Sequence, residues 1–215
     1  MKFLSLTLAA MLLVCQAASA QDTKEEKQLI NWRLSRIDIH NIGIGASLGM
    51  NENMLLSPHV YYRAGSNRNL INAEGGLKYT LCGPTDFKDT DIVRAQYIGA
   101  YMEAHLNFLR WRTGAVYLGP GIGYDWGLSA SYRTSASNTT VRDNAIAKGH
   151  ANASGKVGLK FNHWDASIYF VFNMAPMMDQ KHIFESSGYN YEQVYSQTHE
   201  RCRIGISVSY MIPLQ

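Results

Sequence analysis

Apolar and polar residues alternate along most of the chain from residue 42 onward. The segment 113–127 has apolar and aromatic side chains on one face, and glycines, small residues and Asp125 on the other. A period of two places successive side chains on opposite faces of a β-strand. The alternation therefore predicts strands with one apolar face and one small, polar face.

The same alternation recurs in seven further segments, most weakly in the first two along the chain. None of them shows the 3.6-residue period of an amphipathic helix. An all-β fold with eight strands is therefore expected, at residues 42–49, 53–64, 70–81, 93–108, 113–127, 148–161, 165–175 and 201–212.

The connections between these segments differ in length in a regular way. The second, fourth and sixth links are short, whereas the third, fifth and seventh are long and cover 82–92, 128–147 and 176–200. Outer-membrane barrels have short periplasmic turns and longer extracellular loops. The pattern predicts an eight-stranded antiparallel up-and-down transmembrane β-barrel with both termini on the periplasmic side.

Two observations indicate which face meets lipid. Glycines are concentrated on the polar face, which suits the crowded interior of a small barrel and would weaken a strand that faced water. Aromatic residues gather near the strand ends, as in the interfacial girdles of membrane barrels. We expect membrane-interface aromatics at Tyr62, Phe108, Trp111, Phe161, Trp164 and Tyr210 on the short-turn side, and at Trp126 on the other. The alternative is a soluble secreted barrel that binds a hydrophobic ligand inside.

Two prolines conflict with regular pairing. Pro58 and Pro120 fall in the middle of predicted strands, where proline removes a ladder hydrogen bond. A closed barrel has no edge strand to hold them, so we expect bulges or register irregularities at both.

The N-terminus has the pattern of an export signal. Lys2 precedes an apolar run from Leu4 to Val14, and Ala18-Ser19-Ala20 supplies small residues for cleavage. The predicted organisation is a signal peptide at 1–20, a periplasmic N-terminal segment at 21–41 and a barrel at 42–215. The segment 21–41 fits either an amphipathic helix or an extension of the first strand.

These features together resemble a known family. The signal peptide, the eight alternating segments, the alternating link lengths and the aromatic-tipped final strand, Ile204 to Tyr210, make residues 42–215 similar to the small outer-membrane β-barrels of Gram-negative bacteria. A glutamine directly after the predicted cleavage site, here Gln21, resembles the start of secreted proteins of Bacteroidetes-like bacteria. The resemblance implies a location in the bacterial outer membrane, with outer-membrane lipid and the barrel assembly machinery as partners.

Composition excludes several other classes. The chain has 215 residues, a net charge of +3 and 46% hydrophobic residues, with no apolar run beyond the N-terminus that is long enough for a membrane helix. Lysines and arginines are dispersed among acids, so no nucleic-acid partner is expected. The predicted mature chain has two cysteines, Cys82 and Cys202, so one disulfide is possible.

The polar face carries most of the ionisable groups of the predicted strands. We expect an ion-pair network that fills a lumen too narrow to conduct, formed by His59, Glu74, Lys78, Glu103, His105, Asp125, Lys156 and Arg203, with Arg63, His150 and Asp165 on the same face. The alternative is a gated passage or a proton-sensitive core that involves Glu74, Glu103 and Lys156. A small solute channel is a further alternative.

Motifs for catalysis or metal binding are absent from the sequence. There is no G-x-S-x-G, H-E-x-x-H or phosphate-binding loop, and the histidines have no ligand spacing. We therefore expect neither an enzyme nor a cofactor. The alternative is an outer-membrane lipid-modifying enzyme that uses His150 and Ser154.

The last long link is the best candidate for binding. It carries aromatic side chains of the kind that dominate interfaces, among them Phe184, Tyr189, Tyr191 and Tyr195. We expect a structural role or a binding role, with an extracellular ligand or protein as the partner of the long loops.

Overall fold

A computed structural model describes residues 40–50, 54–83, 85–87, 90–134, 140–142, 144, 147–175, 177 and 202–214. The predicted signal peptide and nearly all of the predicted periplasmic segment lie outside this range. No helix in the described part is long and apolar enough to cross a membrane.

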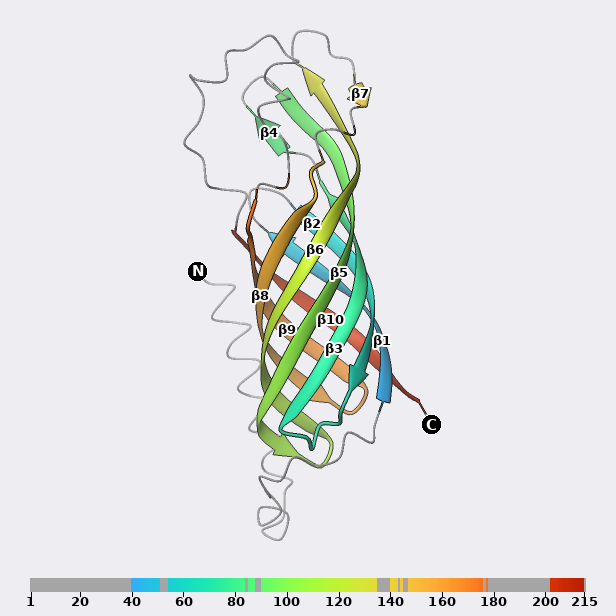
Figure 1. The fold of residues 1–215 in the computed structure, drawn as a ribbon, viewed down its shortest axis with the longest axis vertical. Helices are drawn as coiled ribbons and strands as arrows, with labels where there is room; N and C mark the ends of the chain where they lie inside the picture. The colour runs from blue at the N-terminus through green and yellow to red at the C-terminus, as the bar shows by residue number, and fades with distance from the viewer. Residues whose placement is uncertain are drawn as a thin grey trace.

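Eight long strands close into an antiparallel up-and-down barrel (Figure 1). Each pairs with the next along the chain, and the first pairs with the last from His40 opposite Leu214 to Met50 opposite Ile204. Two short strands, β4 and β7, flank the barrel strands at one end. The bounds are β1 His40–Met50, β2 Met54–Ala64, β3 Ile71–Cys82, β4 Thr85–Phe87, β5 Thr90–Trp111, β6 Gly114–Thr134, β7 Thr140–Arg142, β8 His150–Phe161, β9 Trp164–Asn173 and β10 Cys202–Leu214.

The eight predicted strands are confirmed, each within a few residues except where β5 and β6 run longer. The short links lie together at one end of the barrel, the lower end in Figure 1. Two turn residues there have positive φ, Gly65 at 114° and Asn162 at 51°. Glycine and asparagine are the residues that adopt this backbone conformation most readily, which allows the tight reversals.

The outer face is apolar and the inner face is polar. Apolar side chains from all eight barrel strands are exposed, whereas the buried residues include arginine, lysine, glutamate, aspartate and histidine. A soluble barrel would have the opposite distribution. The period-two pattern therefore sorted the side chains correctly between the inner and outer faces.

The expectation of register irregularities at the prolines was wrong. Pro58 lies opposite Ala46 of β1 and Pro120 lies opposite Gly155 of β8, both in unbroken register. A strand residue directs its N–H to one neighbour only, so proline weakens one ladder and leaves the other intact. On the second side of each proline, with β3 and with β5, the register is the same before and after, but the pairs at Ser57 and Pro58 and at Gly119 and Pro120 are interrupted.

The register shifts occur between β5 and β6 instead. One extra residue is inserted at Val93 and at Phe108 of β5, and at Leu128 of β6. Bulges of this kind bend and twist a strand pair. The bulges at Val93 and Leu128 lie where β5 and β6 continue beyond the other barrel strands.

This continuation forms a projecting sheet, which we define as β4, β7 and the outer ends of β5 and β6 (residues 90–95 and 130–134). β4 pairs with β5 at Thr85–Phe87, and β7 pairs with β6 at Thr140–Arg142. It lies at the end opposite the short turns (Figure 1). Parts of the links expected at 82–92 and 128–147 are therefore strands. They were not predicted because the bulges at Val93 and Leu128 interrupt the alternation that identifies a strand.

Candidate functional site: the filled lumen

The structure places all eight sequence-predicted lumen residues on the inner face, on seven strands if Arg63 and Asp165 are included. All but His59 belong to two clusters, one toward the short turns and one toward the projecting sheet. We call the first, Arg63, Glu74, Glu103, His105, Lys156, Lys160 and Asp165, the lower cluster. We call the second, Lys78, Asp125, His150, Asn152 and Arg203, the upper cluster.

Arg63 is the centre of the lower cluster. Its Nε and Nη2 donate to Glu74 Oε2 at 2.9 and 2.5 Å, and Nη2 also donates to Asp165 Oδ2. Its side chain is 2% exposed. The planar guanidinium suits this position because several fixed N–H groups can satisfy two carboxylates at once.

The other carboxylate of the lower cluster is held by Lys156. Lys156 Nζ lies 2.6 Å from Glu103 Oε2 and 3.9 Å from Glu74 Oε1. His105 Nε2 lies 3.2 Å from Glu103 Oε2. Lys156 on β8 is thus joined across the lumen to β3 and to β5, neither of which pairs with β8, so its charge braces strands that are not neighbours.

Tyrosines complete this network, and reasoning from charge alone gave them no role. Tyr117 donates to Asp165 Oδ1 at 2.8 Å, and Tyr101 donates to Glu74 Oε1 at 3.2 Å. Lys160 Nζ lies over the Tyr117 ring, 4.4 Å from its centroid, and donates to Asn107 Oδ1. The signal available in the sequence was their position on the same alternating face as the charges.

Asp125 is the centre of the upper cluster. Lys78 Nζ lies 3.0 Å from Asp125 Oδ1. Asp125 Oδ2 accepts hydrogen bonds from Asn152 at 3.0 Å and from Arg203 Nη2 at 3.5 Å. His150 Nε2 also lies 3.5 Å from this oxygen. One carboxylate thus serves two basic side chains.

His59 takes part in neither set of ion pairs. Its Nδ1 lies 3.2 Å from the Ser57 carbonyl oxygen, and its ring stacks on that of Tyr61 at 6.0 Å between centroids. It lines a cavity between the two clusters, together with Lys78, Glu103, Lys156 and Arg203.

Glycines on the inner face make room for these side chains. A Cβ at Gly43 would lie 1.9 Å from Tyr61 Cζ, and one at Gly99 would lie 1.9 Å from Asp125 Oδ1. At Gly119 it would lie 2.8 Å from His105 Cδ2. The interior is therefore packed by large side chains lying over glycines, as expected for a barrel of this size.

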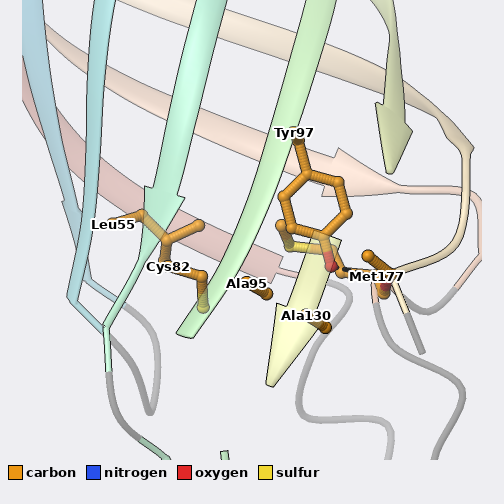
Figure 2. Close-up of a cluster of buried hydrophobic side chains, with 7 residues drawn as sticks. Leu55, Cys82, Ala95, Tyr97, Ala130 and Met177 are labelled. Atoms are coloured by element: carbon orange, nitrogen blue, oxygen red, sulfur yellow. Dashed lines mark hydrogen bonds between the residues drawn. The ribbon is translucent and has the colours of Figure 1, made fainter. Parts of the chain in front are cut away.

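Above the upper cluster lies an apolar cap, which we define as Leu55, Cys82, Ala95, Tyr97, Ala130, Ala147 and Met177. Tyr97 donates to the Met177 carbonyl oxygen at 2.8 Å (Figure 2). Its ring also meets that of His150 edge-on. The alternation did not predict this cap, because the inner face was expected to be polar throughout. Cys82 is buried in it, whereas Cys202 is exposed on β10.

The expected interface aromatics lie largely as the pattern placed them. Six are exposed on the outer face: Tyr62, Phe108, Trp126, Phe161, Trp164 and Tyr210. Trp164 packs edge-on against Tyr210. Trp111 differs, because its indole lies across the turn over Gly114 and is only partly exposed.

The arrangement offers little for the chemistry of the alternatives. His150 contacts Asp125 and the Lys148 carbonyl, whereas Ser154 donates to Glu103 at 3.5 Å. The two therefore belong to different clusters. Glu74, His105 and Asp165 bring ligand-type atoms within 4.8 Å of one another, but Arg63 already bridges the two carboxylates. A cationic side chain thus takes the place a metal ion would need.

The four loop residues proposed for binding, Phe184, Tyr189, Tyr191 and Tyr195, lie outside the described residues. Their role therefore stays a prediction.

No family model matches the chain, and no curated protein matches it. The solved structures that match the chain include the following three. The N-terminal β-barrel domain of Pseudomonas aeruginosa OprF is 11% identical, with a TM-score of 0.41 over 80% of this chain and 97% of that one. Ail, the attachment invasion locus protein of Yersinia pestis, is 11% identical, with a TM-score of 0.40 over 81% of this chain and 97% of that one. Neisserial surface protein A is 13% identical, with a TM-score of 0.42 over 80% of this chain and 95% of that one. Likeness at this distance carries no information about activity.

Proposed function

We propose that the chain is an integral outer-membrane barrel with a closed lumen, which holds a projecting sheet outside the cell for contact with a partner. The observation that carries the first part is the exposed apolar face on all eight barrel strands around a charged interior. Closure of β1 onto β10 satisfies the backbone hydrogen bonds, as a lipid environment requires.

The filling of the lumen supports an anchor in preference to a pore. The lower cluster, the upper cluster and the apolar cap occupy successive levels of the interior. Buried charges that are paired and hydrogen-bonded stabilise a packed interior.

The projecting sheet supports a role in contact with other molecules. It extends the barrel at the end away from the short turns, where outer-membrane barrels carry their extracellular loops. Its β7 residues Thr140, Val141 and Arg142 are all exposed. An extracellular protein or ligand would meet this surface together with the predicted aromatic loop at 176–200.

Insertion in a membrane is tested by substituting the outer face. Ile122 is 64% exposed and lies opposite Met102, which is 69% exposed, in the middle of β6 and β5. Ile122→Arg should reduce the free energy of unfolding in lipid vesicles by about 2–4 kcal/mol, the cost of arginine near the bilayer centre. The matched control is Val141→Arg, 42% exposed in the projecting sheet, which should change little. Equal effects of the two substitutions would contradict the lipid-facing assignment.

Orientation is tested by labelling. In a Cys202→Ser background, Val141→Cys should react with a membrane-impermeant maleimide on intact cells. Arg112→Cys, in the exposed turn between β5 and β6, should react only after the outer membrane is permeabilised. The reverse pattern would overturn the proposed topology.

The closed lumen is tested by conductance. Purified protein in a planar bilayer should give no steady ohmic current. Stable current steps would favour the solute channel over the anchor.

A further inference from the structure

A cavity of about 50 Å³ lies inside the barrel between the two clusters. Three basic side chains line it, Lys78, Lys156 and Arg203, together with hydroxyl groups of Ser47, Ser57, Ser154 and Ser207. This volume has room for a few groups of the size of a water molecule.

The charges around the cavity do not balance. Among the described residues, the lower cluster has three cations and three carboxylates: Arg63, Lys156 and Lys160 with Glu74, Glu103 and Asp165. The upper cluster has Lys78 and Arg203 but only Asp125. With the histidines counted as neutral, the upper cluster carries one excess positive charge. An uncompensated charge inside a protein is costly, so a negative counterpart is expected.

Arg203 is the least satisfied of these cations. Its Nε is buried and has no hydrogen-bond partner among the described residues. Its Nη2 reaches Asp125 at only 3.5 Å, and its Nη1 lies 3.9 Å from Met177 Sδ. The side chain is 6% exposed, so water outside the barrel does not compensate it. Buried charged donors of this kind normally have an acceptor.

We infer that the cavity binds one small monovalent anion of halide size, held by Lys78 and Arg203, with the Ser57 and Ser207 hydroxyls as further donors. A single charge matches the single excess cation, and the volume suits a small anion. Glu103 also lines the cavity, but Lys156 at 2.6 Å neutralises it and limits its repulsion. The site does not depend on the projecting sheet having a partner.

The test uses the full chain folded in detergent, with chloride replaced stepwise by gluconate at constant ionic strength. Chloride should raise the unfolding temperature along a saturating curve, because a ligand that binds only the folded state stabilises it. Lys78→Met or Arg203→Met should raise the chloride concentration at half-saturation about tenfold or more, the equivalent of one charge-assisted hydrogen bond. Lys160→Met removes a buried cation that does not line the cavity, and should keep the original chloride dependence.

A second measurement keeps the inference testable if a variant does not fold. Crystals of the unaltered protein grown in bromide should give an anomalous peak inside the cavity, next to Lys78 and Arg203. A stability curve identical in chloride and gluconate would overturn the anion site, as would equal chloride dependence in all three variants or bromide only at the surface. None of these results bears on insertion in the membrane.

Discussion

The lower and upper halves of the lumen solve the same packing problem with different charge arrangements. In the lower cluster every carboxylate has a basic or tyrosine partner within 3.2 Å, and Arg63 binds two carboxylates through its fork of N–H groups. In the upper cluster two cations share Asp125, and one of them reaches it at only 3.5 Å. The lower half is therefore a charge-balanced brace, and the upper half can accept a further negative group. This difference predicts unequal effects of similar substitutions.

The largest effect is expected at Arg63. Arg63→Met leaves Glu74 and Asp165 buried without their shared cation, so the free energy of unfolding should fall by about 3–5 kcal/mol. Urea unfolding in lipid vesicles, followed by gel mobility, measures this change. Arg68→Met, on an exposed turn, is the control and should have little effect. A loss at Arg63 no larger than that control would mean that the brace is not stabilising.

Asp125→Asn should be the most damaging substitution in the upper half, at about 3 kcal/mol. Among the described residues, Asp125 is the one carboxylate that Lys78 and Arg203 share, so its loss raises the local excess of positive charge. The double variant Asp125→Asn with Arg203→Met should recover part of the loss in the same unfolding assay. No recovery would argue that charge balance is not what Asp125 supplies.

Glycine substitutions compare packing in the two halves. Gly43→Ala should cost about 1–3 kcal/mol, because the added Cβ would meet the Tyr61 ring. Gly99→Ala should cost less, because its neighbours are the ends of the Asp125 and Lys78 side chains, which can shift. Gly155→Ala, with no atom within 4 Å of the added Cβ, is the control and should be neutral. The order of the three unfolding free energies tests the comparison, and a different order would contradict it.

The smallest effect is expected at Arg203. Arg203→Met should cost about 1 kcal/mol or less when chloride is absent, because Lys78 still pairs with Asp125 and the excess charge disappears. The measurement is vesicle unfolding in gluconate. A loss as large as that of Arg63→Met would show that the two halves are equivalent.

Most of the strands, and the side of the barrel that each residue faces, could be predicted from the sequence because both follow from a period of two. Glu74 and Asp125 were assigned to the inner face on this basis. Their partners could not be predicted, because periodicity does not fix how far neighbouring strands slide past each other. The apolar cap was missed for a related reason, since Leu55 and Tyr97 have inward parity but the chemistry expected of the outward face. Bulges at Val93 and Leu128 break the alternation and hid the projecting sheet.

The pairing of β1 with β10 has a consequence for how the chain folds. His40 lies opposite Leu214, so the first and last described strands must meet before the ring is complete. A shortened chain that lacks β10 would leave β1 and β9 as open edges, which invite pairing with other chains. Contacts that span nearly the whole sequence also form late. Closure of the barrel therefore depends on β10, which pairs with β1 on one side and with β9 on the other.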